Sequence, residues 1–279
     1  MQIIKTIHIE EAKPKKAAAY RHVSREIQAE DSTVQVGDVT FGAEKPVIIA
    51  GPCSIESKEQ LLAIAKSVKA SGAQMLRGGA FKPRTSPYSF QGLGIEGLQI
   101  LKEVSDEIGI PTVSELTSID ELPHFIDTVD MLQIGARNMQ NFDLLKKAAQ
   151  SQKPILLKRG MSATLEEFLL AAEYILKEGN SQLVLCERGI RTFENSSRNI
   201  LDLNSLALVR ILSHLPIIAD PSHAGGRRDL ILPLSKAALA AGAQGLIIET
   251  HNDPEQALCD GKQSLTLDQF HDLQTNINQ

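Results

Sequence analysis

Residues 154–189 read PILLKRGMSATLEEFLLAAEYILKEGNSQLVLCERG, and this stretch decides the fold. A short apolar run stands near each end, and each run is followed at once by charged residues. The segment between the two runs has the apolar spacing of a helix, and Thr164 with Glu167 forms the capping-box pattern that begins one. Together they predict a βαβ unit, since parallel strands require a crossover connection of about a dozen residues or more.

The same unit repeats along the chain from residue 45 onward. After the first run, Leu61, Leu62, Ala65 and Val68 share one helical face, and Gly72 marks the end of that helix. The runs begin 20 to 37 residues apart, which is enough for a strand, a helix and two loops. The eight runs lie at 45–51, 74–79, 111–116, 131–136, 154–160, 183–189, 216–223 and 245–251. No GxGxxG motif follows the first run, so this α/β pattern favours a closed (β/α)8 TIM barrel over residues 45–279 rather than an open doubly wound sheet.

Residues 1–44 precede the barrel and predict a short N-terminal extension with a β-hairpin. Val34 and Val36 alternate with polar residues, and the chain returns through residues 39–41. Gly37-Asp38 suits a type II′ turn, and we expect the hairpin to plug the N-terminal mouth of the barrel. Residues 3–10 predict another short strand, and residues 17–30 predict a helix.

Length, charge and cysteine content exclude several classes of protein. A chain of 279 residues suits one large barrel domain, and its formal net charge of −5 argues against nucleic acid or an anionic membrane as the main partner. No apolar stretch approaches the roughly 20 residues of a membrane span, and the first residues lack the apolar region of a signal peptide. Three cysteines, Cys53, Cys186 and Cys259, are an odd number in a chain too large to need disulfides. We therefore expect a cytoplasmic protein with Cys186 in its core, and the role of Cys259 stays open.

Basic residues gather where the predicted strands end, and the carboxyl ends of barrel strands converge on one face. So many cations in a chain of negative net charge predict a polyanionic ligand, because guanidinium groups bind phosphate and carboxylate through paired hydrogen bonds. The alternative is pairing with neighbouring acids, as between Arg159 and Glu187. The basic set comprises Arg77, Lys82, Arg84, Arg137, Lys158, Arg159 and Arg188.

A second group at the same strand ends carries the donor atoms of a metal site. Cys53 follows the first predicted strand, His223 the seventh and Glu249 the eighth, while Asp260 is a weaker candidate. A thiolate, an imidazole and carboxylates together suit a divalent transition ion such as Mn, Fe, Co or Zn better than Mg or Ca. A single Cys or His more often simply packs, so this prediction rests on the shared placement of the group.

Longer motifs then point to a family. The segments IIAGPCSIES, RGGAFKPRTSPYSFQGLG, QIGARNMQN, LLKRGM, CERGIRTF, DPSHAGGRRDL and ALCDGKQSL stand in this order between residues 45 and 265. They resemble the type I 3-deoxy-D-arabino-heptulosonate 7-phosphate (DAHP) synthases, and most closely their short-core branch. The resemblance implies a transferase that condenses phosphoenolpyruvate with erythrose 4-phosphate and water, at the start of the shikimate pathway to aromatic amino acids. It also implies a homotetramer.

The resemblance further implies a role for each site residue. Cys53, His223, Glu249 and Asp260 match the four metal ligands of the family, which makes Asp260 a firm candidate. Phosphoenolpyruvate would be held by Arg77, Lys82, Ala136, Arg137, Lys158 and Arg188, and erythrose 4-phosphate by Arg84 and Thr85. Lys82 is our first choice for donating a proton to the developing alkoxide, because it is the titratable cation between the two subsites. Glu115 and a metal-bound water both stay open as the group that activates the attacking water.

Other functions are weighed against this one. The nearest is 3-deoxy-D-manno-octulosonate 8-phosphate synthase, which uses arabinose 5-phosphate and resembles K-A-N-R-S-S where this chain has KPRTS at residues 82–86. The Pro-Arg-Thr version favours the four-carbon acceptor. A Schiff-base aldolase with Lys158 as nucleophile would leave the metal set without a role. A non-catalytic barrel is disfavoured because every expected ligand is present. We see no added regulatory domain in the chain, so inhibition by Phe, Tyr or Trp is not expected.

Overall fold

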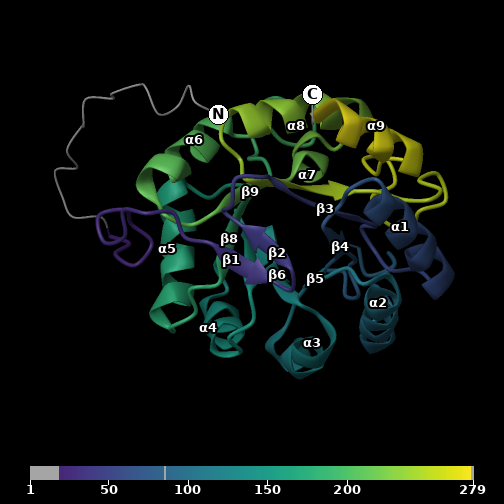
Figure 1. The fold of residues 1–279 in the computed structure, drawn as a ribbon, viewed down its shortest axis with the longest axis horizontal. Helices are drawn as coiled ribbons and strands as arrows, with labels where there is room; N and C mark the ends of the chain where they lie inside the picture. Colours follow the sequence, from purple (N-terminus) through teal and green to yellow (C-terminus); the bar gives the residue numbers. More distant parts are fainter. Residues whose placement is uncertain (1–18, 85, 278–279) are drawn as a thin grey trace.

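The computed structural model describes residues 19–84 and 86–277, and the eight predicted runs are parallel strands of one closed barrel there (Figure 1). The predicted TIM barrel is therefore confirmed. Each strand is two to five residues shorter than its apolar run, because residues at one or both ends of the run lie outside the sheet. The strands are β3 (Val47–Gly51), β4 (Met75–Arg77), β5 (Thr112–Glu115), β6 (Met131–Ile134), β7 (Ile155–Lys158), β8 (Leu183–Glu187), β9 (Ile217–Ala219) and β10 (Gly245–Glu249).

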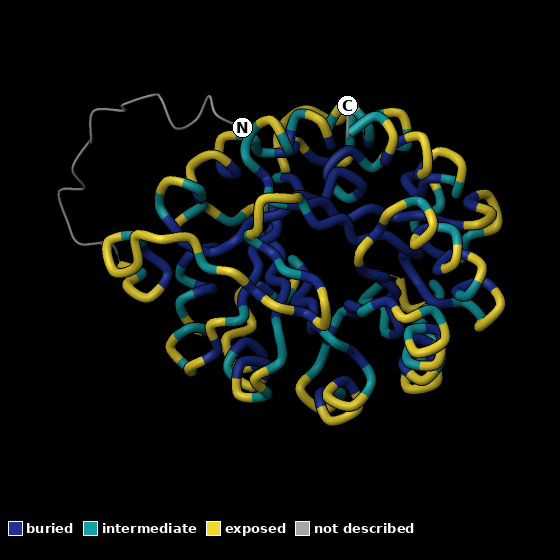
Figure 2. Tube along the Cα trace, viewed as in Figure 1, coloured by how far each residue is buried: buried dark blue, intermediate teal, exposed yellow. Residues whose placement is uncertain are grey.

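Helices alternate with the strands and surround the barrel (Figure 1). Strand residues alternate between two apolar layers: Val47 and Ile49 of β3 belong to the barrel interior, whereas Ile48 and Ala50 pack under the helices. Figure 2 shows the resulting pattern, with buried chain at the centre and exposed chain on the outer helix faces. The helices are α1 (Lys58–Ala70), α2 (Ile95–Ile108), α3 (Leu122–Thr128), α4 (Phe142–Gln150), α5 (Leu165–Lys177), α6 (Leu203–Leu212), α7 (Pro221–Gly225), α8 (Arg228–Ala240) and α9 (Leu267–Ile277).

Local signals in the sequence set where these helices begin and end. The capping box predicted at α5 is confirmed, because the Thr164 hydroxyl accepts from the Glu167 N–H and the Glu167 carboxylate accepts from the Thr164 N–H. In α1, Leu61 and Val68 are fully buried as expected, whereas Leu62 is only half-buried at the edge of the apolar face. Gly72 lies just beyond α1 with a φ of 102°, which suits glycine at this turn.

The predicted hairpin consists of β1 (Val34–Val36) and β2 (Val39–Phe41), which pair antiparallel across a two-residue loop. Gly37 has a φ of 59° and Asp38 keeps a negative φ, which fits a type II′ turn and excludes type I′. The apolar hairpin residues share one buried cluster with Val47, Met75 and Val113, which stand at or near the starts of their strands. The hairpin therefore plugs the N-terminal mouth of the barrel, as predicted.

The helix predicted over residues 17–30 is wrong wherever the structure describes it. Residues 19–30 form turns with one isolated bridge between Ser24 and Ser213. The N–H groups of His22 and Val23 donate to the Glu173 carboxylate of α5, and the Arg25 N–H donates to the carbonyl of Leu212. These partners outside the segment replace helical hydrogen bonds. The strand predicted over residues 3–10 lies outside the described residues.

Among residues 19–84 and 86–277, we find no helix that combines the length and the apolar character needed to cross a membrane. The three cysteines are free, and Cys186 is fully buried in the barrel interior as predicted.

We expect Phe41→Ala to lower the free energy of unfolding by about 3–5 kcal/mol, because it empties a fully buried aromatic site in the plug. Urea unfolding followed by circular dichroism would measure the loss. Thr40→Ala is the matched control on the same strand, since the half-buried Thr40 faces away from the barrel and should contribute about 1 kcal/mol through its bond to Gln35. Equal losses in the two variants would contradict the plug.

Candidate active site at the carboxyl end of the barrel

A pocket of about 310 Å³ opens at the carboxyl ends of the strands. Its described lining holds two carboxylates, Glu115 and Asp260, against a much larger number of cations. Because the chain as a whole carries a net charge of −5, this concentration of positive charge opposes the overall sign of the protein. The lining cations are Arg77, Lys82, Arg84, Arg137, Lys158, Arg188 and Arg198.

Three of these cations are buried at the floor of the pocket. Arg77, Lys158 and Arg188 are each 5 % exposed or less, and they end or directly follow barrel strands. Nη1 of Arg77 and Nη1 of Arg188 have no hydrogen-bond partner within the described chain. Burial lowers the pKa of Arg188, with Arg198 adding to that effect against the attraction of Asp220. Buried guanidinium groups with unpaired N–H bonds are costly, so the floor of this pocket favours an anionic ligand.

Lys82 and Glu115 reach the pocket through space that glycines leave free. A Cβ on Gly135 would lie 1.9 Å from Glu115 Oε1, and one on Gly79 would lie 2.9 Å from Lys82 Cδ. Lys82 Nζ donates to the Cys53 carbonyl at 3.1 Å. Burial alone would lower the pKa of Lys82, but nearby Cys53 and Glu115 outweigh it, so this pKa is raised. Lys82 is therefore held as an ammonium group.

The remaining predicted binding residues lie around the same pocket where they are described. Ala136 and Arg137 stand in a short 3₁₀ turn directly after β6, and both line the pocket. Arg84 lines it as well, and its Nη1 donates to Cys259 Sγ at 2.9 Å. Thr85 lies outside the described residues.

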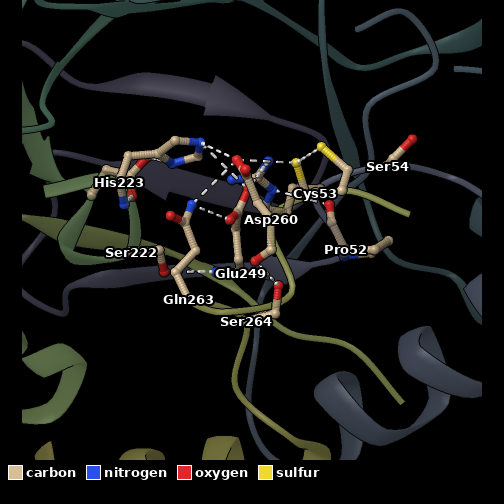
Figure 3. A network of polar contacts seen from close by, with 12 residues as sticks. Pro52, Cys53, Ser54, Ser222, His223, Glu249, Asp260, Gln263 and Ser264 are labelled. Atoms are coloured by element: carbon tan, nitrogen blue, oxygen red, sulfur yellow. Dashed lines mark hydrogen bonds and ion pairs between the residues drawn. The ribbon is translucent and has the colours of Figure 1, made fainter. Parts of the chain in front are cut away.

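The four predicted metal ligands converge on one side of the pocket (Figure 3). His223 Nε2 lies 3.4 Å from Glu249 Oε1 and 3.9 Å from Asp260 Oδ2. Cys53 Sγ lies 3.6 Å from the same Asp260 oxygen. Glu249 Oε1 is buried without a hydrogen bond in the described chain, although Arg77 Nη2 lies 3.0 Å away. A thiol, an imidazole and two carboxylates with an uncommitted oxygen fit a divalent transition ion.

Charges and burial around this group favour the metal-binding forms of Glu249 and His223, but not that of Cys53. The pKa of Glu249 is lowered to about 2, because His223 and Arg77 outweigh the effect of its burial. Burial lowers the pKa of His223 despite the nearby acids, so its ring is neutral near pH 7. Cys53 Sγ and Cys259 Sγ are within hydrogen-bonding distance, and this contact lowers the pKa of Cys259 while it raises, together with burial, the pKa of Cys53. Ligands to divalent metals must be deprotonated, a state that Glu249 and His223 already have near pH 7, whereas the Cys53 thiol would lose its proton on binding the metal.

Asp220 links the candidate metal ligands to the buried cations at the floor of the pocket, a role that the sequence did not predict. Its Oδ2 accepts from His223 Nδ1 at 2.7 Å and from Lys158 Nζ, and its Oδ1 accepts from the His223 N–H. The bond to Nδ1 leaves Nε2 directed at the carboxylates, as in the carboxylate–histidine pairs of metal sites. His223 and Lys158 pull the pKa of Asp220 well below its usual value, although burial opposes them.

Two further features differ from the sequence reasoning. Arg159 does not line the pocket, because it pairs with Glu187 and Asp202, both at 2.9 Å, as the alternative interpretation held. Arg198 was missed, although it lines the pocket and donates to Gln263 Oε1. Gln263 in turn donates to Glu249 Oε2. Both residues lie in loops well beyond the strand ends, so a rule that selects strand ends could not find them.

We expect Asp220→Asn to lower the free energy of unfolding of the metal-free protein by about 3–5 kcal/mol, because it leaves buried Lys158 without its counter-charge. Asparagine still caps α7, so the loss isolates the charge. The control Glu103→Gln removes the exposed pair with Lys58 and should change the stability far less, because solvent screens that pair. Urea unfolding would measure the loss of stability in each variant. Similar losses would contradict a large contribution from the buried pair of Asp220 and Lys158.

With this geometry described, comparison with known proteins gives a consistent result. Residues 20–279 match the family described as DAHP synthetase I. The chain is 55% identical to phospho-2-dehydro-3-deoxyheptonate aldolase of Thermotoga maritima over 91% of its length and 75% of the relative's. The crystal structure of the Thermotoga maritima enzyme superimposes with a TM-score of 0.92 at 53% identity, covering 94% of this chain and 77% of that one. A 2-dehydro-3-deoxyphosphooctonate aldolase of Syntrophotalea carbinolica is 36% identical, over 85% of this chain and 91% of its own. The chain therefore belongs to the DAHP synthetase I family.

Proposed function

We propose that this chain is a metal-dependent DAHP synthase, which condenses phosphoenolpyruvate with erythrose 4-phosphate and water and releases phosphate. The observation that carries the proposal is the set of cations that converge beside a thiol–imidazole–carboxylate group in one pocket. Two phosphorylated substrates, one of them also a carboxylate, supply the negative charge that this pocket lacks. The family match and the Thermotoga maritima enzyme support the same reaction.

Phosphoenolpyruvate is assigned to the buried floor. Arg77 and Arg188 offer N–H bonds that have no partner within the described chain, and Lys158 lies with them. Arg137 and the backbone of Ala136 approach from the turn after β6. Charge-assisted hydrogen bonds from these groups would fix the donor's phosphate and carboxylate in one orientation.

Erythrose 4-phosphate is assigned to the side of the pocket that carries Arg84. This residue belongs to the KPRTS motif at 82–86, from which the family resemblance takes the acceptor-binding Arg84 and Thr85. Arg84 lies against Cys259, next to the candidate metal ligands. Phosphate binding at Arg84 would therefore leave the aldehyde end of the acceptor close to those ligands.

Cys53, His223, Glu249 and Asp260 would hold the metal, an ion such as Mn, Fe, Co or Zn. When bound, such an ion supplies a positive charge that polarises the aldehyde oxygen. The chain's own residues do the rest of the positioning. Asp220 fixes the ring of His223, and Arg77 lies beside Glu249 at the boundary between the two subsites.

Lys82 is the proposed proton donor in the carbon–carbon bond-forming step. The C3 atom of phosphoenolpyruvate attacks the aldehyde, and the aldehyde oxygen develops negative charge that a nearby ammonium can neutralise. The raised pKa keeps Lys82 protonated, and an alkoxide is a strong enough base to take its proton. Glu115 faces the same pocket and is proposed to orient the water that adds at C2, after which phosphate leaves.

The alternatives are less well supported. The octulosonate 8-phosphate enzymes are matched at 33 to 36% identity, against 55% for the heptulosonate enzyme, and the KPRTS motif favours the shorter acceptor. Lys158 is ion-paired with Asp220 rather than free in an apolar pocket, which disfavours a Schiff-base aldolase. We further propose the short-core subtype, a cytoplasmic homotetramer, and a catalytic unit over 45–279 preceded by the extension over 1–44.

We expect phosphoenolpyruvate consumption with erythrose 4-phosphate and little or none with arabinose 5-phosphate. Phosphate release would be followed for each aldose, before and after thorough chelation and again after each candidate ion is restored. Because the metal polarises the acceptor, chelation should abolish turnover and restoration should recover it. Turnover that survives metal removal would sink the metal assignment, and a preference for arabinose 5-phosphate would sink the proposed acceptor.

Replacing Arg84 should act on one substrate only. We expect Arg84→Ala to raise KM for erythrose 4-phosphate about tenfold or more, since a hydrogen bond to a charged group contributes about 1.5–3 kcal/mol. KM for phosphoenolpyruvate should stay close to that of the native enzyme. Arg227→Ala, which removes an exposed arginine paired with Asp229, is the control and should change neither constant. A rise confined to phosphoenolpyruvate would reverse the two assignments.

A further inference from the structure

Cys259 has no role in the reaction described above, yet its sulfur lies inside the proposed metal centre. Its Sγ is 2.9 Å from Cys53 Sγ. The donor atoms of Cys53, Cys259 and Asp260 lie within 4.8 Å of one another, as do those of His223, Glu249 and Asp260. The two groups share Asp260, so Cys259 is part of the same cluster of donors.

We propose that Cys259 supplies a second thiolate to this centre, which makes it a two-sulfur site suited to zinc and similar thiophilic ions. The inference rests on the metal centre of the proposed function and adds to it a residue of this chain. Soft sulfur ligands favour such ions, and two thiolates strengthen that preference over a site with one.

The backbone holds Cys259 in this place. Asp260 has a φ of 50°, a left-handed conformation that is uncommon for residues other than glycine. A Cβ on Gly261 would lie 2.1 Å from the Pro254 carbonyl oxygen, so the turn around Asp260 is tight. The Leu258 N–H donates to Glu56 Oε1 on one side of this turn, and the Ser264 hydroxyl donates to the Asp260 carbonyl on the other. This strained, tied turn directs two neighbouring side chains at Cys53.

The surroundings of Cys259 differ from those of a cysteine that only packs. Cys186 is also buried, but it lies among apolar residues of the barrel interior. Cys259 instead lines the polar pocket, where Arg84 Nη1 donates to its sulfur at 2.9 Å. A guanidinium donor stabilises negative charge on sulfur, and a metal binds the thiolate rather than the thiol.

A second thiolate would also change which residues coordinate the ion when no substrate is bound. Catalytic metal centres keep a position open for substrate or water, whereas closed centres fill every position with protein ligands. Cys53, Cys259, His223, Glu249 and Asp260 offer more donors than a four-coordinate ion uses. With a four-coordinate ion, one of these residues would give way to substrate, and Cys259 is the one with no other part in the proposed reaction.

The test counts the sulfur atoms bound to zinc in the full chain. Native protein is stripped of metal, kept reduced with a phosphine rather than a thiol, and loaded with one equivalent of Zn²⁺ for X-ray absorption at the zinc edge. Cys259→Ala is the test variant. Cys186→Ala is the matched control, since it removes a buried cysteine outside the pocket.

Two sulfur neighbours are expected in native protein and in Cys186→Ala, and one in Cys259→Ala. Competition with a chelator should show zinc held about tenfold or more weakly by Cys259→Ala alone. One sulfur in native protein, or two in Cys259→Ala, would overturn the proposal for Cys259 while the metal centre stands. Failure of native protein to take up zinc, cobalt or manganese would overturn both the centre and this inference. Circular dichroism on each variant checks that it has folded.

Discussion

Hydrogen bonds between β10 and β3 close the sheet, and the whole carboxyl end depends on that closure. They set Glu249 level with Gly51, two residues before Cys53, although these residues are about 200 positions apart in the chain. Because β4 pairs with the other edge of β3, the closure also brings Arg77 at the end of β4 near Glu249. In an open sheet with the same strands, first and last strand would lie at opposite edges, and neither the donors nor the cations would meet.

The buried charges at the carboxyl end of the barrel are only partly balanced by one another. Two buried carboxylates, Asp220 and Glu249, lie against Lys158 and Arg77, so these charges are partly balanced without a ligand. Arg188 has no ion pair with a described residue, and its pKa is lowered. A protein tolerates such a group when a ligand compensates its charge, and in the proposed function a substrate anion would do so.

Much of this arrangement could be predicted from the sequence, because the signals concerned are local. Apolar runs at regular spacing, the Thr164 capping box and the Gly37-Asp38 turn each act within a few residues, and all three predictions hold. The helix predicted around Val23 fails because its backbone donors are taken by Glu173, about 150 residues away. The roles of Asp220 and Gln263 were not predicted for a related reason: these residues bridge other site residues, and only the folded chain brings those residues together.

The hairpin plug determines how substrates enter the barrel and how products leave it. With β1 and β2 packed into the N-terminal mouth, the described barrel is closed at that end, and the pocket lies at the other. Donor, acceptor, water and both products of the proposed reaction then pass through one shared entrance. A molecule seated at the floor, near Arg188, can be trapped there by whatever arrives after it. The order of arrival and departure is thus a property of the scaffold, imposed by a two-residue turn on the far side of the barrel.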